Sequence, residues 1–181
     1  MDKNYFMKPS LLVSTVLVSL LAGCSHKELS REDAFTIIKR EMSYPKEMEF
    51  KIYAGDPEEA AKLKNSFLEK DGFIEILSSK TLSDPRPWIS FTGKSAPYLL
   101  PTPEKDIKYA IQRVKTAEEN IDKVTGIQMQ KEDKEAIVEY STVLTHITPF
   151  GEWLKFDTIK SPKHNVLFSL YDDGWRMEKP Q

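Results

Sequence analysis

Three patterns of apolar and polar residues follow one another along this chain of 181 residues. Residues 11–22 are almost continuously apolar. Residues 30–100 combine two segments of helical apolar spacing with short strand-like segments, whereas residues 106–181 mostly alternate apolar and polar side chains. A period near 3.6 residues indicates an amphipathic helix, and a period of two indicates a strand with one buried face. The chain is therefore predicted to be an α+β protein, in which a small helix-rich module precedes a curved antiparallel β-sheet module.

The first helix is expected to begin behind Ser30. Asp33 follows at the position where a capping box usually has Glu, and apolar residues then recur at helical spacing as far as Met42. Pro45 ends this pattern, because the residue before a proline avoids the helical conformation. Residues 48–52 alternate apolar and charged side chains, which predicts a short strand.

A second helix and a hairpin are expected next. Asp56 is a suitable cap and Pro57 a suitable first helical residue. Gly72 fits a left-handed stop at the end of this helix. Residues 73–77 and 88–92 are rich in apolar and β-branched side chains and flank a turn that contains two prolines, so they predict a pair of strands.

This order of elements, across residues 30–100, resembles the ground plan of a winged-helix domain. The segment ISFTGKSAPYLL is similar to a second wing strand that leads into a short turn. A winged helix usually has one more helix than the pattern predicts here. Most winged helices bind DNA, and a small packing unit or protein-docking module is the competing interpretation.

Residues 101–105 are rich in proline and mark the predicted linker between the two modules. Beyond the linker, apolar residues predict strands over residues 107–114 and 121–129, with a helix over residues 104–121 as the alternative. Residues 136–144 alternate most regularly and give the clearest strand in the chain. The module is expected to extend to the end of the chain, residue 181.

The chain closes with a predicted hairpin. Residues 165–171 and 175–177 are strand-like, and Asp172-Asp173-Gly174 between them is a typical turn. The ending VLFSLYDDGWRME resembles the closing hairpin of cystatin-like and NTF2-like lipoprotein domains. That resemblance covers only these residues and implies a curved antiparallel sheet.

The amino-terminal apolar run has the length of a signal-peptide core, which is shorter than a membrane-spanning helix. It ends in Leu21-Ala22-Gly23-Cys24, and these residues resemble the lipobox of bacterial lipoproteins at all four positions. The resemblance implies that residues 1–23 are removed and that Cys24 carries a diacylglyceryl group and an amino-terminal acyl chain such as palmitate. Residues 24–29 would form a lipidated spacer. Ser25 is similar to the residues that release Gram-negative lipoproteins to the periplasmic face of the outer membrane.

Charge and cysteine content narrow the possible partners. The whole chain has 26 basic and 28 acidic residues, of which Lys3, Lys8 and Asp2 lie in the leader. The chain from Cys24 onward thus has 24 basic and 27 acidic residues and a formal charge of −3. Such a balance gives no electrostatic reason to bind nucleic acid. Cys24 is the only cysteine, so no disulfide can form within the chain.

The sequence has no recognisable catalytic set, and no cofactor or metal ion is predicted. The nucleophile-elbow pattern Gly-x-Ser-x-Gly is absent. His26 belongs to the spacer, whereas His146 and His164 flank one connection and would approach each other if their strands are neighbours. Asp157 is the only further metal ligand suggested by position, and a zinc site needs three or four ligands. The paired carboxylates at residues 58–59 and 172–173 are explained by a helix start and a turn.

Aromatic residues offer the remaining candidates for a binding site. Phe150 and Trp153 lie in a predicted loop or edge between two strands, where aromatic side chains can form interface hot spots. Core packing is the competing interpretation for both residues.

The sequence thus predicts a membrane-anchored lipoprotein of the bacterial cell envelope. Its expected role is to dock or scaffold another envelope protein without catalysing a reaction. Two alternatives stay open: a small-ligand carrier or hydrolytic enzyme with a pocket inside the curved sheet, and an immunity or inhibitor lipoprotein. The oligomeric state is not predicted.

Overall fold

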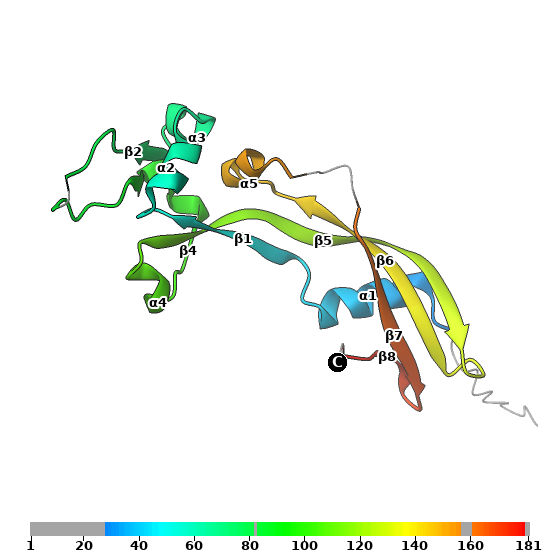
Figure 1. Ribbon diagram of the computed structural model, residues 1–181. Coiled ribbons are helices and arrows are strands. Elements are labelled where there is room, and N and C mark those ends of the chain that lie inside the picture. Colours follow the sequence, from blue (N-terminus) through cyan, green and yellow to red (C-terminus); the bar gives the residue numbers. More distant parts are fainter. Residues whose placement is uncertain (1–27, 82, 157–160, 180–181) are drawn as a thin grey trace, which may run out of the picture.

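The computed structural model describes residues 28–81, 83–156 and 161–179. The body is elongated and is organised along one strand, β5 (Ile111–Gln130), which runs from one end to the other (Figure 1). A strand of 20 residues measures about 60 Å at roughly 3.3 Å per residue. The predicted α+β class is confirmed, because helices pack on a strongly curled antiparallel sheet.

Within the described residues the main sheet is antiparallel throughout. Its order is β1-β5-β6-β7-β8, and β4 also pairs with β5. The strands other than β5 are β1 (Lys46–Tyr53), β4 (Leu99–Leu100), β6 (Glu135–Thr145), β7 (Lys163–Tyr171) and β8 (Gly174–Met177). The clean alternation at residues 136–144 and the Asp-Gly turn before Gly174 are therefore confirmed as β6 and the β7–β8 hairpin.

A first core lies under α1 (Arg31–Glu41). Ser30 caps this helix as predicted, since its hydroxyl accepts a hydrogen bond from the Asp33 amide at 3.0 Å. Ala34 and Ile38 are fully buried against the sheet. The buried members of the first core are Leu29, Ala34, Ile38, Tyr44, Ile121, Val124, Ala136, Val138, Tyr140, Val166 and Phe168.

A second core lies at the other end of β5. It is formed where β1 and β5 meet α2 (Pro57–Leu63), α3 (Phe67–Lys70), the paired strands β2 (Ile74–Ile76) and β3 (Ile89–Phe91), and α5 (Pro149–Leu154). Its buried members are Ile52, Ala54, Ala60, Leu63, Leu68, Phe73, Ile74, Ile89, Val114 and Phe150.

The helix predicted to run from Pro57 to Gly72 is two helices. The break falls at Asn65, whose φ of 61° is left-handed, and the backbone of Lys64 is extended. Gly72 has a φ of 74° and provides the predicted left-handed stop after α3. Both helices still place their apolar residues in the second core, so the break changes the path of the chain without exposing that face.

The segment after β3 contains the 3₁₀ helix η1 (Gly93–Tyr98) and the short helix α4 (Glu104–Ile107). Residues 104–121 were predicted to be strand, with a helix as the alternative. The helix is limited to α4, and the chain is strand from Ile111 onward. The two strands predicted over 107–114 and 121–129 are one continuous strand that starts at Ile111. A bulge opposite Met48 and Glu49, with two further irregularities opposite β6, lets β5 coil along its length.

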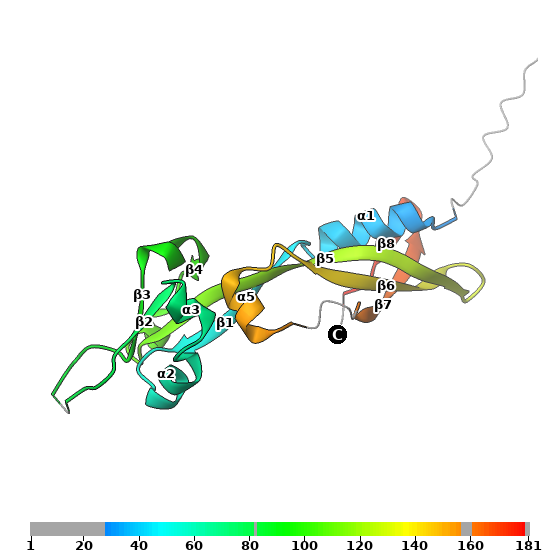
Figure 2. The same cartoon turned by 90° about the horizontal axis from the view of Figure 1, so that it is seen from above.

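In Figure 1, α4 lies below β4, and α2, α3 and α5 lie above β5. α1 overlaps β6 and β7 in this view, because it packs on the face of the sheet. Figure 2 shows from above that α1 and the second-core helices occupy opposite ends of the body. Each core takes residues from both sides of the predicted linker at 101–105, because β1 pairs with β5 and α1 packs against β5 and β8. The division of the chain into modules stays a prediction.

Candidate functional site

The predicted lipid attachment site, Cys24, lies outside the described residues, as does the leader before it. The described chain begins at Glu28, and Leu29 is already part of the first core with 4% of its surface exposed. Residues 25–28 are thus all that separates Cys24 from a buried side chain. Even fully extended, this connection spans only about 18 Å.

Phe150 lies in α5, which Thr148 caps by accepting a hydrogen bond from the Gly151 amide at 3.3 Å. The Phe150 side chain is 1% exposed. Its ring meets the rings of Phe73, Phe91 and Tyr98 at centroid distances of 6.4, 6.3 and 6.3 Å. Phe150 is therefore a central packing residue of the second core.

Trp153 is partly buried beside the same core. Its ring packs edge-on against Phe50 of β1, with 6.1 Å between the centroids. The structure gives both predicted aromatic residues a packing role. A partner contact stays a prediction, and Trp153 is the better exposed of the two side chains.

The two histidines do not meet, although β6 and β7 are neighbours as the prediction required. The His146 Nδ1 atom lies 3.0 Å from a carboxylate oxygen of Glu118, and His164 Nε2 lies 3.9 Å from one of Glu119. Glu118 and Glu119 are consecutive on β5, so their side chains point to opposite faces of the sheet. The arrangement of His146 and His164 around one cavity, which was one example of the polar cleft expected for the enzyme alternative, is therefore absent. Among the described residues no group of three or more His, Cys, Asp and Glu side chains could hold a metal ion, and Asp157 lies outside them.

A cluster of polar groups that the sequence did not indicate lies at the edge of the first core, and we call it the tyrosine–histidine cluster. The Tyr44 and Tyr140 hydroxyls are 3.5 Å apart, and the ring of His164 stacks on that of Tyr140 at 5.1 Å. The Thr142 hydroxyl donates to Glu119 at 2.8 Å and lies 3.2 Å from His164 Nε2. The cluster joins the end of α1, β5, β6 and β7 through side chains.

The surroundings shift the pKa of one tyrosine and of one glutamate in this region. Burial raises the pKa of Tyr44 above its usual value, and its hydrogen bond to Tyr140 and the charge of Glu119 act in the same direction. On the other face of β5, the hydrogen bond from Lys115 at 2.6 Å lowers the pKa of Glu118, and His146 adds to this effect. Tyr44 can therefore donate a proton in a hydrogen bond at neutral pH, which suits a structural cross-link.

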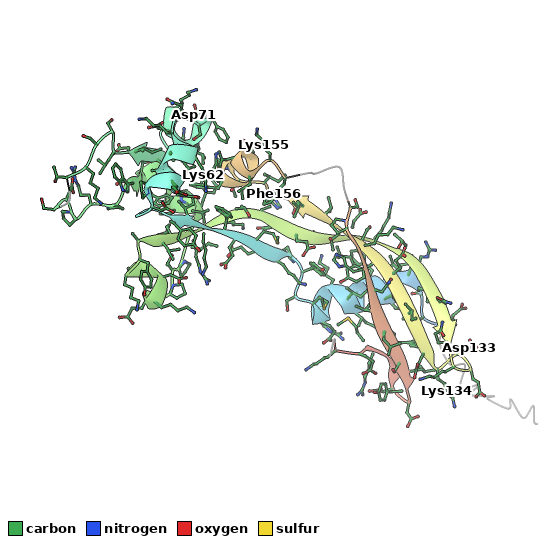
Figure 3. The ribbon with its side chains drawn as sticks, viewed as in Figure 1. Lys62, Asp71, Asp133, Lys134, Lys155 and Phe156 are labelled. Carbon is green, nitrogen blue, oxygen red and sulfur yellow. The ribbon has the colours of Figure 1, made fainter. Side chains whose placement is uncertain are left out.

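A cleft of about 800 Å³ lies at the end of the sheet where α1 begins. The β5–β6 and β7–β8 turns form its walls, and Figure 3 places Asp133 and Lys134 at this end, far from Lys62, Lys155 and Phe156. It is lined by Glu28, Met129, Glu132, Asp133, Lys134, Leu170, Tyr171, Asp172 and Trp175. Four carboxylates, one lysine and several apolar side chains give a surface that can accept a positively charged group with an apolar part.

A second group of exposed side chains lies at the opposite end of β5. Tyr53, Ile107 and Tyr109 are 47%, 60% and 65% exposed. Together they form what we call the distal patch. The sequence pattern placed Ile107 and Tyr109 in a strand with apolar residues of the sheet, and no local signal marked them as exposed.

Comparison with known proteins gave no relative. No protein-family model matches the chain, and no match was found among curated proteins or solved structures. In the described part of the chain, no helix has the length and apolar character needed to cross a membrane.

Proposed function

We propose that this protein is a lipid-anchored lipoprotein of the bacterial cell envelope that docks or positions another envelope protein without catalysing a reaction. The observation that carries the proposal is the burial of Leu29 so soon after the lipobox cysteine. A single acyl chain binds membranes reversibly, whereas several chains on one residue hold a protein stably. With so short a connection, an acylated Cys24 keeps the folded body beside the bilayer.

The filled interior of the sheet supports docking over the carrier or enzyme alternative. α1 covers the inner face of β5, β6 and β7, and the side chains between them are packed as the first core. The packed first core therefore leaves no space for a pocket between α1 and the curved sheet. The cleft beside Glu28 favours a carrier as the second candidate, with its ligand at the end of the sheet. Ser25 supports localisation to the periplasmic face of the outer membrane in a Gram-negative cell.

The anchor is tested by Cys24→Ser in the native bacterium, with an alkyne analogue of palmitate as the label. We expect the unsubstituted protein to take up the label and sediment with membranes, and the variant to lose both properties. Ser25→Ala is the matched control and keeps the label. A Cys24→Ser variant that is labelled as strongly as the unsubstituted protein would contradict the anchor.

Docking is tested separately with a photo-crosslinking amino acid at Lys155, an exposed residue beside Trp153. We expect one adduct of defined mass in intact cells. Inserting about twenty Gly and Ser residues after Ser25 moves the body away from the bilayer and should weaken the adduct, because the reach of a flexible linker grows with its length. A strong adduct that the insertion does not weaken would show that proximity to the bilayer is not needed. If the photo-crosslinking amino acid gives no adduct at Lys155, nor when it is placed at Trp153, docking at this end of the molecule would be contradicted.

A further inference from the structure

The distal patch surrounds the point where β1 ends and β5 begins. Tyr53 is the last residue of β1 and pairs with Ile111, and the Ala54 amide donates to the Ala110 carbonyl at 2.8 Å. Ile107 ends α4, and Tyr109 lies between α4 and β5. Three large side chains with apolar surface are therefore exposed within one short region of the molecule.

This region is held in place by ion pairs to one buried carboxylate. Asp106 of α4 is buried, and its carboxylate lies 3.1 Å from Lys51 Nζ and 3.7 Å from Arg113 Nε. Lys51 and Arg113 face each other on β1 and β5, so the ion pairs fasten α4 to the sheet. Because Asp106 points inward, its neighbour Ile107 and the following Tyr109 are left to face outward.

Two lysines accompany the exposed apolar residues. Lys105 and Lys108 are exposed, and the Lys108 ammonium group lies 5.0 Å from the centre of the Tyr109 ring. Tyrosine is enriched at the level of lipid headgroups, where its ring is apolar and its hydroxyl stays wet. Lysine covers apolar surface with its stem while its ammonium group meets anionic headgroups. The composition of the distal patch fits a bilayer surface.

The position of the distal patch fits the same partner. It adjoins the first residue of β5, whereas Glu28 and Met129, at the other end of β5, line the cleft where the chain enters from Cys24. Because the body is elongated along β5, a protein tethered at the end near Glu28 can lie with the distal patch, at the other end, against the same bilayer.

We propose that the distal patch is a second membrane contact, in which Tyr53, Ile107 and Tyr109 enter the headgroup region of a bilayer that contains anionic phospholipid. Lys105 and Lys108 meet the phosphates. The protein then lies along the membrane and exposes α2, α3 and α5 to the periplasm. This orientation rests on the proposed lipid anchor at Cys24.

The test uses the mature lipoprotein, reconstituted into vesicles of roughly three parts phosphatidylethanolamine to one part phosphatidylglycerol. An acylated Cys24 has no free thiol, so Glu104→Cys provides one site for a nitroxide label beside the distal patch. Lys62→Cys provides the matched control on α2, on the other side of this end of the molecule (Figure 3). We expect a water-soluble nickel complex to collide about three-fold less often with the label at residue 104 than with the label at residue 62, because the headgroup region excludes it.

Adding Ile107→Ser and Tyr109→Ser to the Glu104→Cys protein should abolish this protection. Tyr171→Ser is the control, since Tyr171 is as exposed as Tyr53 but lies at the cleft. Equal collision rates at residues 104 and 62 would overturn the proposal. Protection that disappears when the protein is diluted in lipid would identify a second copy as the occupant, and protection that needs added envelope protein would identify a protein. Either result also overturns it.

Failure of the anchor is distinguishable from failure of the distal patch. Without acylation, the purified chain lacks the added mass on Cys24 and does not enter the vesicles. If only the patch proposal is wrong, the acylated protein enters the vesicles and its label at residue 104 stays accessible.

Discussion

The two cores of this protein bury their apolar side chains in different ways. The first core places α1 on consecutive antiparallel strands. The second core joins short elements, and in it Phe150 is at the centre of ring contacts to Phe73 and to the partly buried Phe91 and Tyr98. The first core depends on the alternation of its strands, whereas the second depends on segments that are short and far apart in the chain. β5 contributes Val114 to the second core and Ile121 to the first, so it connects them covalently.

The largest expected effect comes from removing one central ring in either core. Phe150→Ala and Phe168→Ala should each lower the free energy of unfolding by about 3–5 kcal/mol, because each ring is almost completely buried. Leu167→Ala is the matched control, since Leu167 is exposed on the strand next to Phe168, and it should cost less than about 1 kcal/mol. Urea unfolding measures all three values.

The same titrations test whether the cores are one cooperative unit. Because the single strand β5 contributes Val114 to the second core and Ile121 to the first, we expect circular dichroism and tryptophan fluorescence to give coincident transitions in the unsubstituted protein and in both variants. Two separated transitions, with only the second moved by Phe150→Ala, would show that the cores unfold independently.

A smaller but more specific effect is expected at Gly151, where α5 approaches β5. A Cβ atom at this position would lie 2.1 Å from the Thr116 carbonyl oxygen, and the Thr148 amide donates to that same oxygen at 2.9 Å. Since the obstacle is backbone, Gly151→Ala should cost about 3 kcal/mol. Gly93→Ala, at the start of η1, meets no atom within 4 Å and should be close to neutral. Equal unfolding midpoints for the two variants would mean that α5 does not sit against Thr116.

The first core should also be the more sensitive of the two to alkaline pH. The pKa of Tyr44 is raised in the fold above the 10.0 expected of the unfolded chain. Its contribution to stability is complete below pH 10 and falls as the pH rises further, because the unfolded state then gives up the proton first. The loss of unfolding free energy between pH 8 and pH 11 should be smaller in Tyr44→Phe than in the unsubstituted protein. An equal alkaline loss in both proteins would contradict the burial of this hydroxyl.

The contrast between the cores also explains what the sequence could predict. Ser30, Asp56 and Gly72 mark helix ends through local chemistry, and their roles are confirmed. The strand at 136–144 and the hairpin at Gly174 follow from alternation and turn preference, which are equally local. Most of the strand framework of the first core could therefore be predicted.

The remaining features depend on contacts that no local pattern contains. β5 appeared interrupted because Glu118, Glu119 and Asn120 are polar, but these residues pair with β6 and Glu119 bonds to Thr142. The residues of α5 were expected to form a loop or an edge. Their short helix is fixed by the Thr148 hydroxyl, which donates to the distant Lys115 carbonyl at 2.7 Å, and no local pattern contains this contact. The tyrosine–histidine cluster joins Tyr44 to Tyr140, which are 96 residues apart, and such a distant pairing has no signature in one sequence.

The proposed function and the proposed membrane contact both require a folded body directly behind an acylated Cys24. Mass spectrometry of the amino-terminal peptide, taken from protein extracted from native membranes, measures this modification. We expect a chain that begins at Cys24, with a diacylglyceryl group on its sulfur and an acyl chain on its amino group. A peptide that still contains residues 1–23, or one that begins at an unmodified residue, would contradict it.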